Sequence, residues 1–198
     1  MTRHVVLVGL MGSGKTTVGR RLAARLERAF VDADEALEEI TDRTVAEVFA
    51  EDGERGFRAI EADVLEELLE HHEPTVIASG GGVVLNGESR HRLQQANVTT
   101  VWLAASPAFL ASRVQAKPHR PLLAGEESPR QLLDRLHRER AALYAEVADI
   151  VIEVEPFHRE EEKPKRALAE RIADLVRAHE AATGAGAAPD PAAGVEAP

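Results

Sequence analysis

The chain has 198 residues, of which 44% are hydrophobic and 29% are charged, as in a soluble protein with one sizeable core. Its formal net charge of −10 argues against broad binding to nucleic acids or anionic membranes, because such surfaces attract proteins with an excess of Lys and Arg. The absence of cysteine excludes disulfides, thiolate metal sites and cysteine nucleophiles.

The N-terminus lacks the pattern of a secretory signal, and no run approaches the roughly 20 apolar residues that a membrane span needs. We therefore expect a cytoplasmic protein with no membrane and no nucleic-acid partner, and we expect it to be a monomer.

Five short apolar or β-branched runs alternate with longer helical patterns. They cover residues 4–10, 29–34, 75–79, 98–105 and 149–154. Because this alternation is typical of βαβ units, it predicts an α/β fold with three α/β/α layers, in which a five-stranded parallel sheet carries helices on both faces.

Apolar residues at helical spacing predict the helices between the strands. They cover residues 16–28, 57–70, 86–96, 106–116 and 128–148, and a last helix starts near Pro164. From about residue 181 the chain is rich in Ala, Gly and Pro, and it has too few large apolar groups to offset its ordering entropy. We expect one domain over residues 1–180 and a disordered tail over 181–198.

Residues 9–17, GLMGSGKTT, follow the first strand and precede a helix. They match the phosphate-loop pattern G-x-x-x-x-G-K-S/T, in which small residues let backbone N–H groups close around phosphate oxygens at a helix N-terminus. Lys15 would neutralise the β- and γ-phosphates, and Thr16 would offer its hydroxyl to Mg²⁺. The alternative is a plain glycine-rich turn. The expected ATP-binding residues of this loop are Met11, Gly12, Ser13, Gly14, Lys15, Thr16 and Thr17.

A phosphate loop does not by itself say how the nucleotide is used. The chain has neither the N-K-x-D nor the D-x-x-G motif of a switch GTPase. Neither its third nor its fourth strand ends in the carboxylate pair that is usual in a motor ATPase. A small-molecule kinase is therefore the favoured class.

Asp32 and Asp34 end the second strand at the edge of the sheet where open α/β folds bind their ligands. Residues two apart on a strand point the same way, so both carboxylates should face the phosphate loop. Asp32 suits the Mg²⁺ shell, and Asp34 could accept the proton of an attacking hydroxyl. The alternative is that the pair caps the helix that follows.

Gly80, Gly81 and Gly82 follow the third strand. Three successive glycines carry a large backbone entropy cost, so we expect a ligand to approach their bare N–H groups closely. An unusually tight turn is the alternative.

The segments GLMGSGKT, DAD, GFRAIE, SGGGVV, RPLLAG and RERAALY, in this order and spacing, resemble those of shikimate kinase, one of the nucleoside-monophosphate-kinase-like P-loop proteins. The resemblance covers about residues 3–178. It implies a P-loop kinase fold with a lid. It also implies ATP-dependent, Mg²⁺-requiring phosphorylation of the 3-hydroxyl of shikimate, a step of the chorismate route to aromatic amino acids.

The resemblance further implies how the acceptor is held. Arg58 and Arg140 would bind the shikimate carboxylate through their guanidinium groups, with Glu61 holding Arg58 in place. The backbone of Gly80–Gly82 would contact shikimate, and Asp34 would contact its hydroxyls and act as base or orienting group.

Two alternatives to this arginine pair remain. Arg58 could form only an exposed helix pair with Glu54 or Glu61, which would contribute little. Arg138 could replace Arg140, because the chain has Ala142 where the family often has proline.

Three further assignments follow from the resemblance. Phe49 and Phe57 match apolar walls of the acceptor pocket, although both could be plain core. Residues 112–126 match the lid, whose Arg120 would reach the phosphates on closure unless the segment is a solvated surface loop. Arg113 and Pro164 fall where the family sandwiches adenine, but the segment before Pro164 is longer and more acidic than the usual connection.

Two other functions stay open. A gluconate-type or other sugar-acid kinase would share the fold and the phosphate loop, and the arginine pair with the glycine triplet favours shikimate over it. A non-catalytic nucleotide-binding module would need no acceptor site, and the presence of Asp34 and the arginine pair speaks against it.

Overall fold

The structure, a computed structural model, describes residues 3–114, 127–160 and 163–184. Five parallel strands form one sheet in the order β2-β3-β1-β4-β5, which confirms the predicted fold. Each strand ends before its predicted limit, because the residues at the carboxyl edge already belong to loops and helix starts. The strands are β1 (His4–Val8), β2 (Ala29–Asp32), β3 (Thr75–Ala78), β4 (Val98–Ala104) and β5 (Ile150–Glu153).

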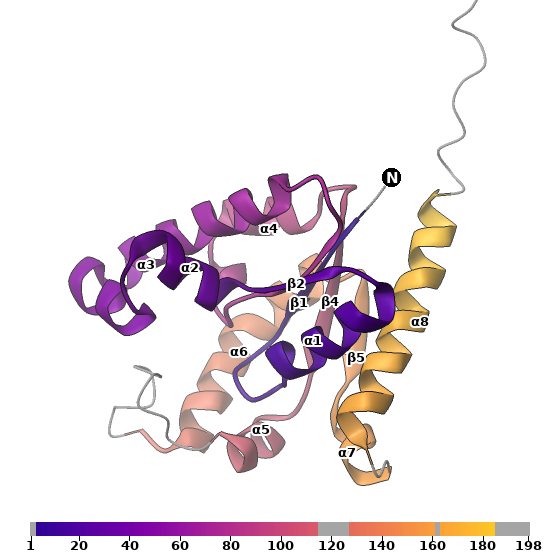
Figure 1. Cartoon of the computed structure of the whole chain (residues 1–198). Coiled ribbons are helices and arrows are strands. Elements are labelled where there is room, and N and C mark those ends of the chain that lie inside the picture. Colours follow the sequence, from indigo (N-terminus) through magenta and orange to yellow (C-terminus); the bar gives the residue numbers. More distant parts are fainter. Residues whose placement is uncertain (1–2, 115–126, 161–162, 185–198) are drawn as a thin grey trace, which may run out of the picture.

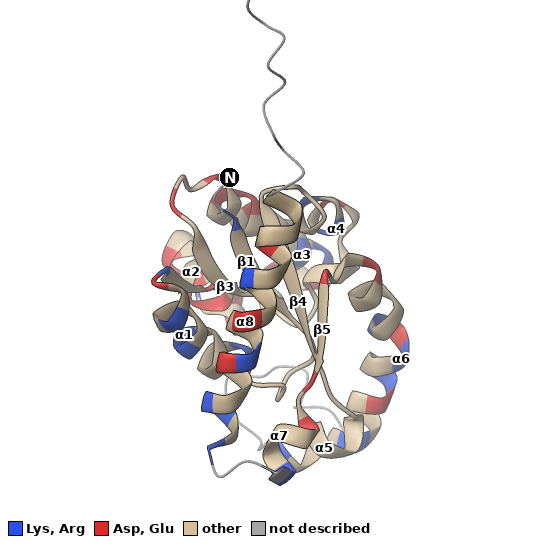
Figure 2. Cartoon of the chain, turned by 90° about the vertical axis from the view of Figure 1, so that its right-hand side faces the viewer, with Lys and Arg blue, Asp and Glu red and all other residues tan. Residues whose placement is uncertain are grey.

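Helices cover both faces of the sheet. On one face α1 (Lys15–Leu26) and α8 (Pro164–Gly184) lie side by side, and on the other lie α3 (Val45–Glu70), α4 (Gly87–Leu93) and α6 (Pro129–Val147) (Figure 1). Charged side chains follow the helices, whereas the strands carry few of them (Figure 2). The central strand β1 is accordingly apolar, with Val5, Val6, Leu7 and Val8 all 0% exposed.

Shorter helices follow the strands directly at the carboxyl edge. They are α2 (Ala33–Thr41) after β2, the 3₁₀ turn η1 (Val83–Leu85) after β3, α5 (Pro107–Arg113) after β4 and α7 (Glu155–Glu160) after β5. Helix α7 lies in the acidic segment that the sequence analysis treated only as a connection. None of the described helices is long and apolar enough to cross a membrane.

Helix α3 begins well before the predicted residue 57. A capping box starts it, because the Thr44 hydroxyl accepts from the Glu47 N–H at 3.2 Å and the Glu47 carboxylate accepts from the Thr44 N–H at 2.8 Å. Gly53, with φ 68° and ψ −178°, then interrupts the helix. The periodic pattern was recognisable only beyond this interruption, which explains the missed first half.

The prediction of a disordered tail from residue 181 was wrong at its boundary. Helix α8 continues to Gly184, since Ala181 and Ala182 favour helix and the Thr183 hydroxyl donates to the His179 carbonyl at 2.7 Å. The remaining tail, residues 185–198, lies outside the described residues, as do residues 115–126 of the predicted lid with Arg120.

Candidate active site

A pocket of about 480 Å³ lies at the carboxyl edge of the sheet, where β1, β2 and β3 end. Every predicted site residue among the described parts of the chain lines it, except Ser13, Arg113 and Pro164. Val45, Glu61 and Ser79 line it as well. The fold therefore brings the predicted phosphate loop and the predicted acceptor residues to one cavity.

The phosphate loop turns sharply between β1 and α1. Gly12 and Gly14 have φ values of 86° and 97°, in the left-handed region that favours glycine. Gly14 is the N-cap of α1 and supplies no side-chain acceptor, so the first N–H groups of the helix face the pocket. The Lys15 ammonium group donates to the carbonyls of Gly9 at 2.7 Å and Leu10 at 3.3 Å. The loop thus has the geometry of an anion cradle.

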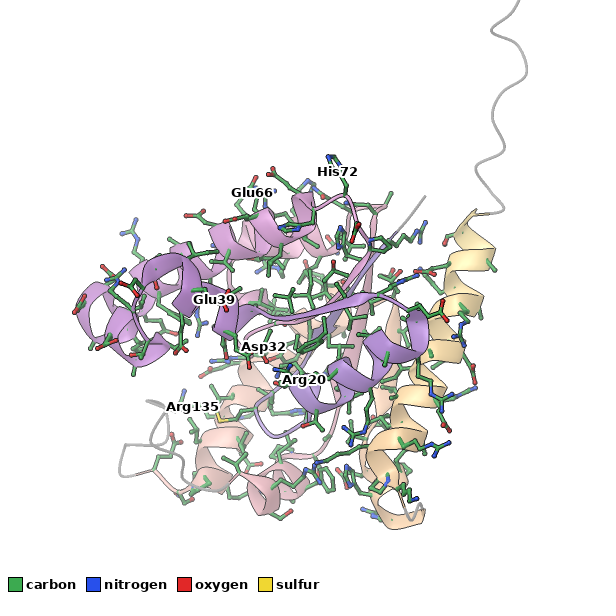
Figure 3. The ribbon with its side chains drawn as sticks, viewed as in Figure 1. Arg20, Asp32, Glu39, Glu66, His72 and Arg135 are labelled. Atoms are coloured by element: carbon green, nitrogen blue, oxygen red, sulfur yellow. The ribbon has the colours of Figure 1, made fainter. Side chains whose placement is uncertain are left out.

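Asp32 is the last residue of β2 and lies where this strand gives way to α2 (Figure 3). Its Oδ1 accepts from the Asp34 N–H at 3.1 Å, so the predicted alternative of a helix cap holds for this residue. Its Oδ2 accepts from the Thr16 hydroxyl at 2.7 Å. The two side chains place hard oxygen donors beside the phosphate loop, the donor type that Mg²⁺ prefers.

Asp34 was expected at the end of the second strand, and the structure places it elsewhere. Helix α2 begins at Ala33, so Asp34 occupies its first turn, and strand alternation does not apply. It still lines the same pocket as Asp32. Crowding by surrounding protein atoms, then the negative charge of Asp32, raises the pKa of its solvent-facing carboxyl, while Lys15 and Arg58 oppose the shift.

Of the three glycines after β3, Gly80 and Gly82 lie where side chains pack closely against the backbone. None of them has a positive φ, so an unusually tight turn does not account for them. A Cβ at Gly80 would lie 2.2 Å from Glu61 Oε1, and one at Gly82 would lie 2.3 Å from Cζ of Arg58. The sequence predicted close approach of a ligand to these glycines, which stays a prediction; the groups that approach Gly80 and Gly82 in the structure are side chains of the site itself.

Arg58 and Glu61 form a buried pair under this glycine segment. Arg58 Nη1 lies 2.7 Å from Glu61 Oε2, and the two side chains are 13% and 6% exposed, so Arg58 does not form only an exposed helix pair. Its Nη2 also lies 3.7 Å from Oε1 of Glu54, the other predicted partner, which is 61% exposed. Burial raises the pKa of the Glu61 carboxyl, and Arg58 opposes the shift. The Arg58 guanidinium also lies 5.0 Å from the Phe57 ring, which packs 5.5 Å from that of Phe49. The glutamate therefore fixes the arginine against an aromatic wall.

Arg140 reaches the pocket from α6 and is 4% exposed. Its Nη1 donates to the Gly81 carbonyl at 2.9 Å, and within the described ranges no carboxylate lies close enough to form an ion pair with it. Helix α6 continues without interruption through Ala142. Arg138 is exposed and lies in a separate surface hollow with Glu127 and Arg135, so it does not replace Arg140.

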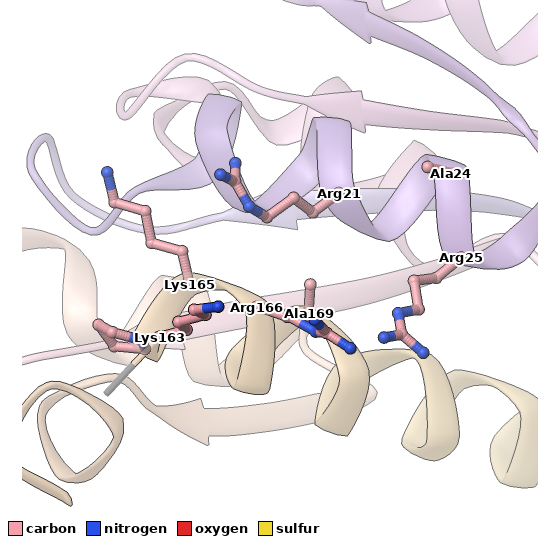
Figure 4. Close-up of a pocket in the computed structure, with 8 residues that line it drawn as sticks. Arg21, Ala24, Arg25, Lys163, Lys165, Arg166 and Ala169 are labelled. Atoms are coloured by element: carbon pink, nitrogen blue, oxygen red, sulfur yellow. The ribbon is translucent and has the colours of Figure 1, made fainter. Parts of the chain in front are cut away.

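Arg113 and Pro164, the predicted adenine pair, lie outside this pocket. Arg113 Nε donates to the Gly12 carbonyl at 3.2 Å, and its Nη1 lies 3.3 Å from Nδ1 of His158. Pro164 instead lines a second, larger hollow of about 850 Å³ between α1 and α8, beside the basic side chains of Arg21 and Lys165 (Figure 4). That hollow contains none of the phosphate-loop residues.

Sequence reasoning missed Tyr144. Its hydroxyl donates to the same Gly81 carbonyl at 2.5 Å, and its ring stacks on that of Trp102 with centroids 5.7 Å apart. The signal was present, because Tyr144 follows Arg140 by one helical turn and therefore shares its face of α6.

Comparison with known proteins gives consistent matches. A family model described as shikimate kinase matches residues 11–177. A shikimate kinase of Dechloromonas aromatica is 45% identical over 151 residues, covering 76% of this chain and 81% of that protein. The solved structure of the Acinetobacter baumannii shikimate kinase in complex with shikimate superimposes with a TM-score of 0.82 at 37% identity, covering 91% of this chain and 96% of that one.

A gluconokinase from Sinorhizobium meliloti superimposes less closely, with a TM-score of 0.56 at 22% identity and coverage of 89% and 97%. At this identity the likeness shows a shared fold alone.

Proposed function

This chain belongs to the shikimate kinase family and phosphorylates shikimate with ATP, and from this premise we propose which residues carry the reaction at its 3-hydroxyl. Arg58 and Arg140 grip the carboxylate of shikimate. The backbone of Gly80–Gly82 contacts the acceptor, and Phe49 and Phe57 form the apolar wall around its ring.

The observation that carries this proposal is that Arg140 is buried and lacks an ion-pair partner among the described residues. It is a buried guanidinium without a carboxylate in ion-pair range in the described part of the chain, and its Nε has no hydrogen-bond partner there. Arg140 acts on Glu61 only from beyond ion-pair range, and that carboxylate already pairs with Arg58. An anionic ligand in contact with the buried Arg140 guanidinium would therefore stabilise the site. The Arg58 Nε is buried and without a partner in the same way. A carboxylate can accept from both guanidinium groups.

The phosphate loop and Asp34 line the same pocket, and this arrangement supports phosphoryl transfer. The N–H groups of residues 11–17 and the Lys15 ammonium hold the ATP phosphates, and Asp34 orients the shikimate hydroxyl and accepts its proton. Thr16 and Asp32 would hold Mg²⁺, which would neutralise charge on the transferred phosphoryl group. A contact of Arg120 from the lid with the ATP phosphates is also part of the proposal, and it rests on the resemblance alone.

At the other end of ATP, Arg113 and Pro164 contact adenine. For Arg113 the hydrogen bond to the phosphate loop supports this role, whereas for Pro164 it rests on the resemblance. One chain supplies every proposed residue of the acceptor site, so a monomer would suffice for the proposed reaction. We propose a cytoplasmic location for the enzyme, since ATP is available there.

An ADP-release assay with an acceptor panel tests this function. With Mg²⁺-ATP, we expect ADP release with shikimate and only background release with gluconate, quinate or no acceptor. Addition of EDTA should abolish the shikimate-dependent rate if Mg²⁺ is required. ADP release that is independent of shikimate would contradict the assignment, and a preference for gluconate would favour the sugar-acid kinase.

Gly82→Ala tests the reason for the glycine segment. The new Cβ would lie 2.3 Å from Cζ of Arg58 and should push the guanidinium out of position. We expect the KM for shikimate to rise about tenfold, and the KM for ATP to stay nearly unchanged. Gly87→Ala is the matched control, because nothing lies within 4 Å of a Cβ at that position. Equal kinetics in the two variants would show that Gly82 is not needed to make room for Arg58.

A further inference from the structure

We propose that Tyr144 is a positioning residue for phosphoryl transfer, which holds the acceptor-binding glycine segment in register with the phosphate loop. The proposal rests on the function given above, in which Gly80–Gly82 and Arg140 hold shikimate. Tyr144 does not line the pocket, so it acts through Gly81 and not by touching either substrate.

The Gly81 carbonyl accepts hydrogen bonds from two side chains of helix α6. It accepts from the Tyr144 hydroxyl at 2.5 Å and from Arg140 Nη1 at 2.9 Å. Two donors on one carbonyl fix the orientation of the peptide group that follows it, and hence the direction in which the Gly82 N–H points. Because Tyr144 is 1% exposed, water has little access to replace its hydroxyl.

Gly81 also lies against the phosphate loop. A Cβ at Gly81 would be 3.5 Å from the Gly9 carbonyl oxygen and 3.7 Å from the Met11 nitrogen. The Trp102 ring, on which Tyr144 stacks, lies close to Gly9, since a Cβ there would be 3.5 Å from its Cδ1. Tyr144 therefore contacts the acceptor segment through its hydroxyl and a neighbour of the phosphate loop through its ring.

This arrangement sets the distance between the two substrates. The phosphate loop holds the γ-phosphate, and the glycine segment contacts the acceptor whose hydroxyl Asp34 orients, so a shift between the two segments changes the line of attack. A displacement of about 1 Å at the reacting atoms can lower a rate by roughly 100-fold without a loss of binding. Loss of the hydroxyl should consequently affect kcat more than KM.

Tyr144→Phe tests the proposal, because it removes the hydroxyl and keeps the ring on Trp102. We expect kcat for shikimate phosphorylation to fall about 10- to 100-fold, and the KM for ATP to stay within about twofold of the wild-type value. The matched control is Thr100→Val, which removes another buried hydroxyl, the one that donates to the Leu93 carbonyl at 2.9 Å away from the pocket. Thermal unfolding of both variants gives the stability cost of one lost buried hydrogen bond.

A fall in kcat for Tyr144→Phe that greatly exceeds the fall for Thr100→Val, at a similar decrease in Tm, would support the proposal. A kcat within twofold of the wild type would overturn it and leave Tyr144 a purely structural role. A failure of the proposed function is distinguishable, because the wild-type protein itself would then lack shikimate-dependent ADP release.

Discussion

Asp34→Asn is expected to lower kcat by about 100- to 10,000-fold, while the dissociation constants of ATP and shikimate change little. The asparagine keeps the shape of the side chain but cannot accept a proton from the attacking hydroxyl. Steady-state kinetics together with calorimetric binding of each substrate measure the two effects separately. Glu39→Gln, an exposed carboxylate on the same helix α2, is the control for loss of a negative charge (Figure 3). A near-normal kcat in Asp34→Asn would remove Asp34 from the mechanism.

The raised pKa of Asp34 adds a pH dependence to this prediction. In the proposed role the ionised carboxylate is the active form, so kcat/KM for shikimate, which reports the free enzyme, should fall as pH decreases through the raised pKa, at a higher pH than an ordinary aspartate would give. Because the pKa of Asp34 is higher in the folded than in the unfolded protein, ionisation of Asp34 also disfavours the folded state at any pH above the ordinary pKa of an aspartate. At neutral pH, Asp34→Asn should therefore unfold at a temperature no lower than the wild type.

Arg58→Ala is expected to weaken shikimate binding by about 1.5 to 3 kcal/mol, or roughly 10- to 150-fold in Kd, and to leave ATP binding nearly unchanged. In the proposed site the guanidinium makes charge-assisted hydrogen bonds to the acceptor carboxylate, and alanine would make none. Titration calorimetry with shikimate and with an ATP analogue measures both affinities. An equal loss for the two ligands would refute the assignment of Arg58 to the acceptor.

Arg58→Ala also leaves Glu61 buried without its partner, which could lower stability and so confuse the result. The double variant Arg58→Ala/Glu61→Gln removes both charges and should recover stability but not shikimate affinity. Arg55→Ala, an exposed arginine on the same helix, is the matched control and should bind shikimate like the wild type. Recovery of affinity in the double variant would mean that Arg58 acts only by neutralising Glu61.

The sequence predicted the sheet and the phosphate loop because both are local signals. Apolar runs mark buried parallel strands, and the spacing of Gly9, Gly14, Lys15 and Thr16 is fixed by the geometry of the loop itself. Helix α7 was missed because it is short and polar, with no apolar stripe to reveal it.

The contacts between distant segments could not be predicted in the same way. Asp34 was expected on a strand and lies in a helix, because the boundary at Ala33 depends on a cap that Asp32 provides. The packing of Arg58 against Gly82 and of Tyr144 against Gly81 joins segments that only the folded sheet brings together. Their residue types were visible in the sequence, but the reason for them was not.

The glycine segment also limits how this pocket could change its choice of acceptor. The residues of this segment are already the smallest possible. Gly80 lies against the Glu61 side chain, and Gly82 lies against that of Arg58. These two positions cannot be made smaller, so space for a bulkier acceptor would have to come from another part of the pocket lining. Phe49, which is only partly buried and pairs with Phe57, is the position at which directed evolution toward larger ring acids would begin.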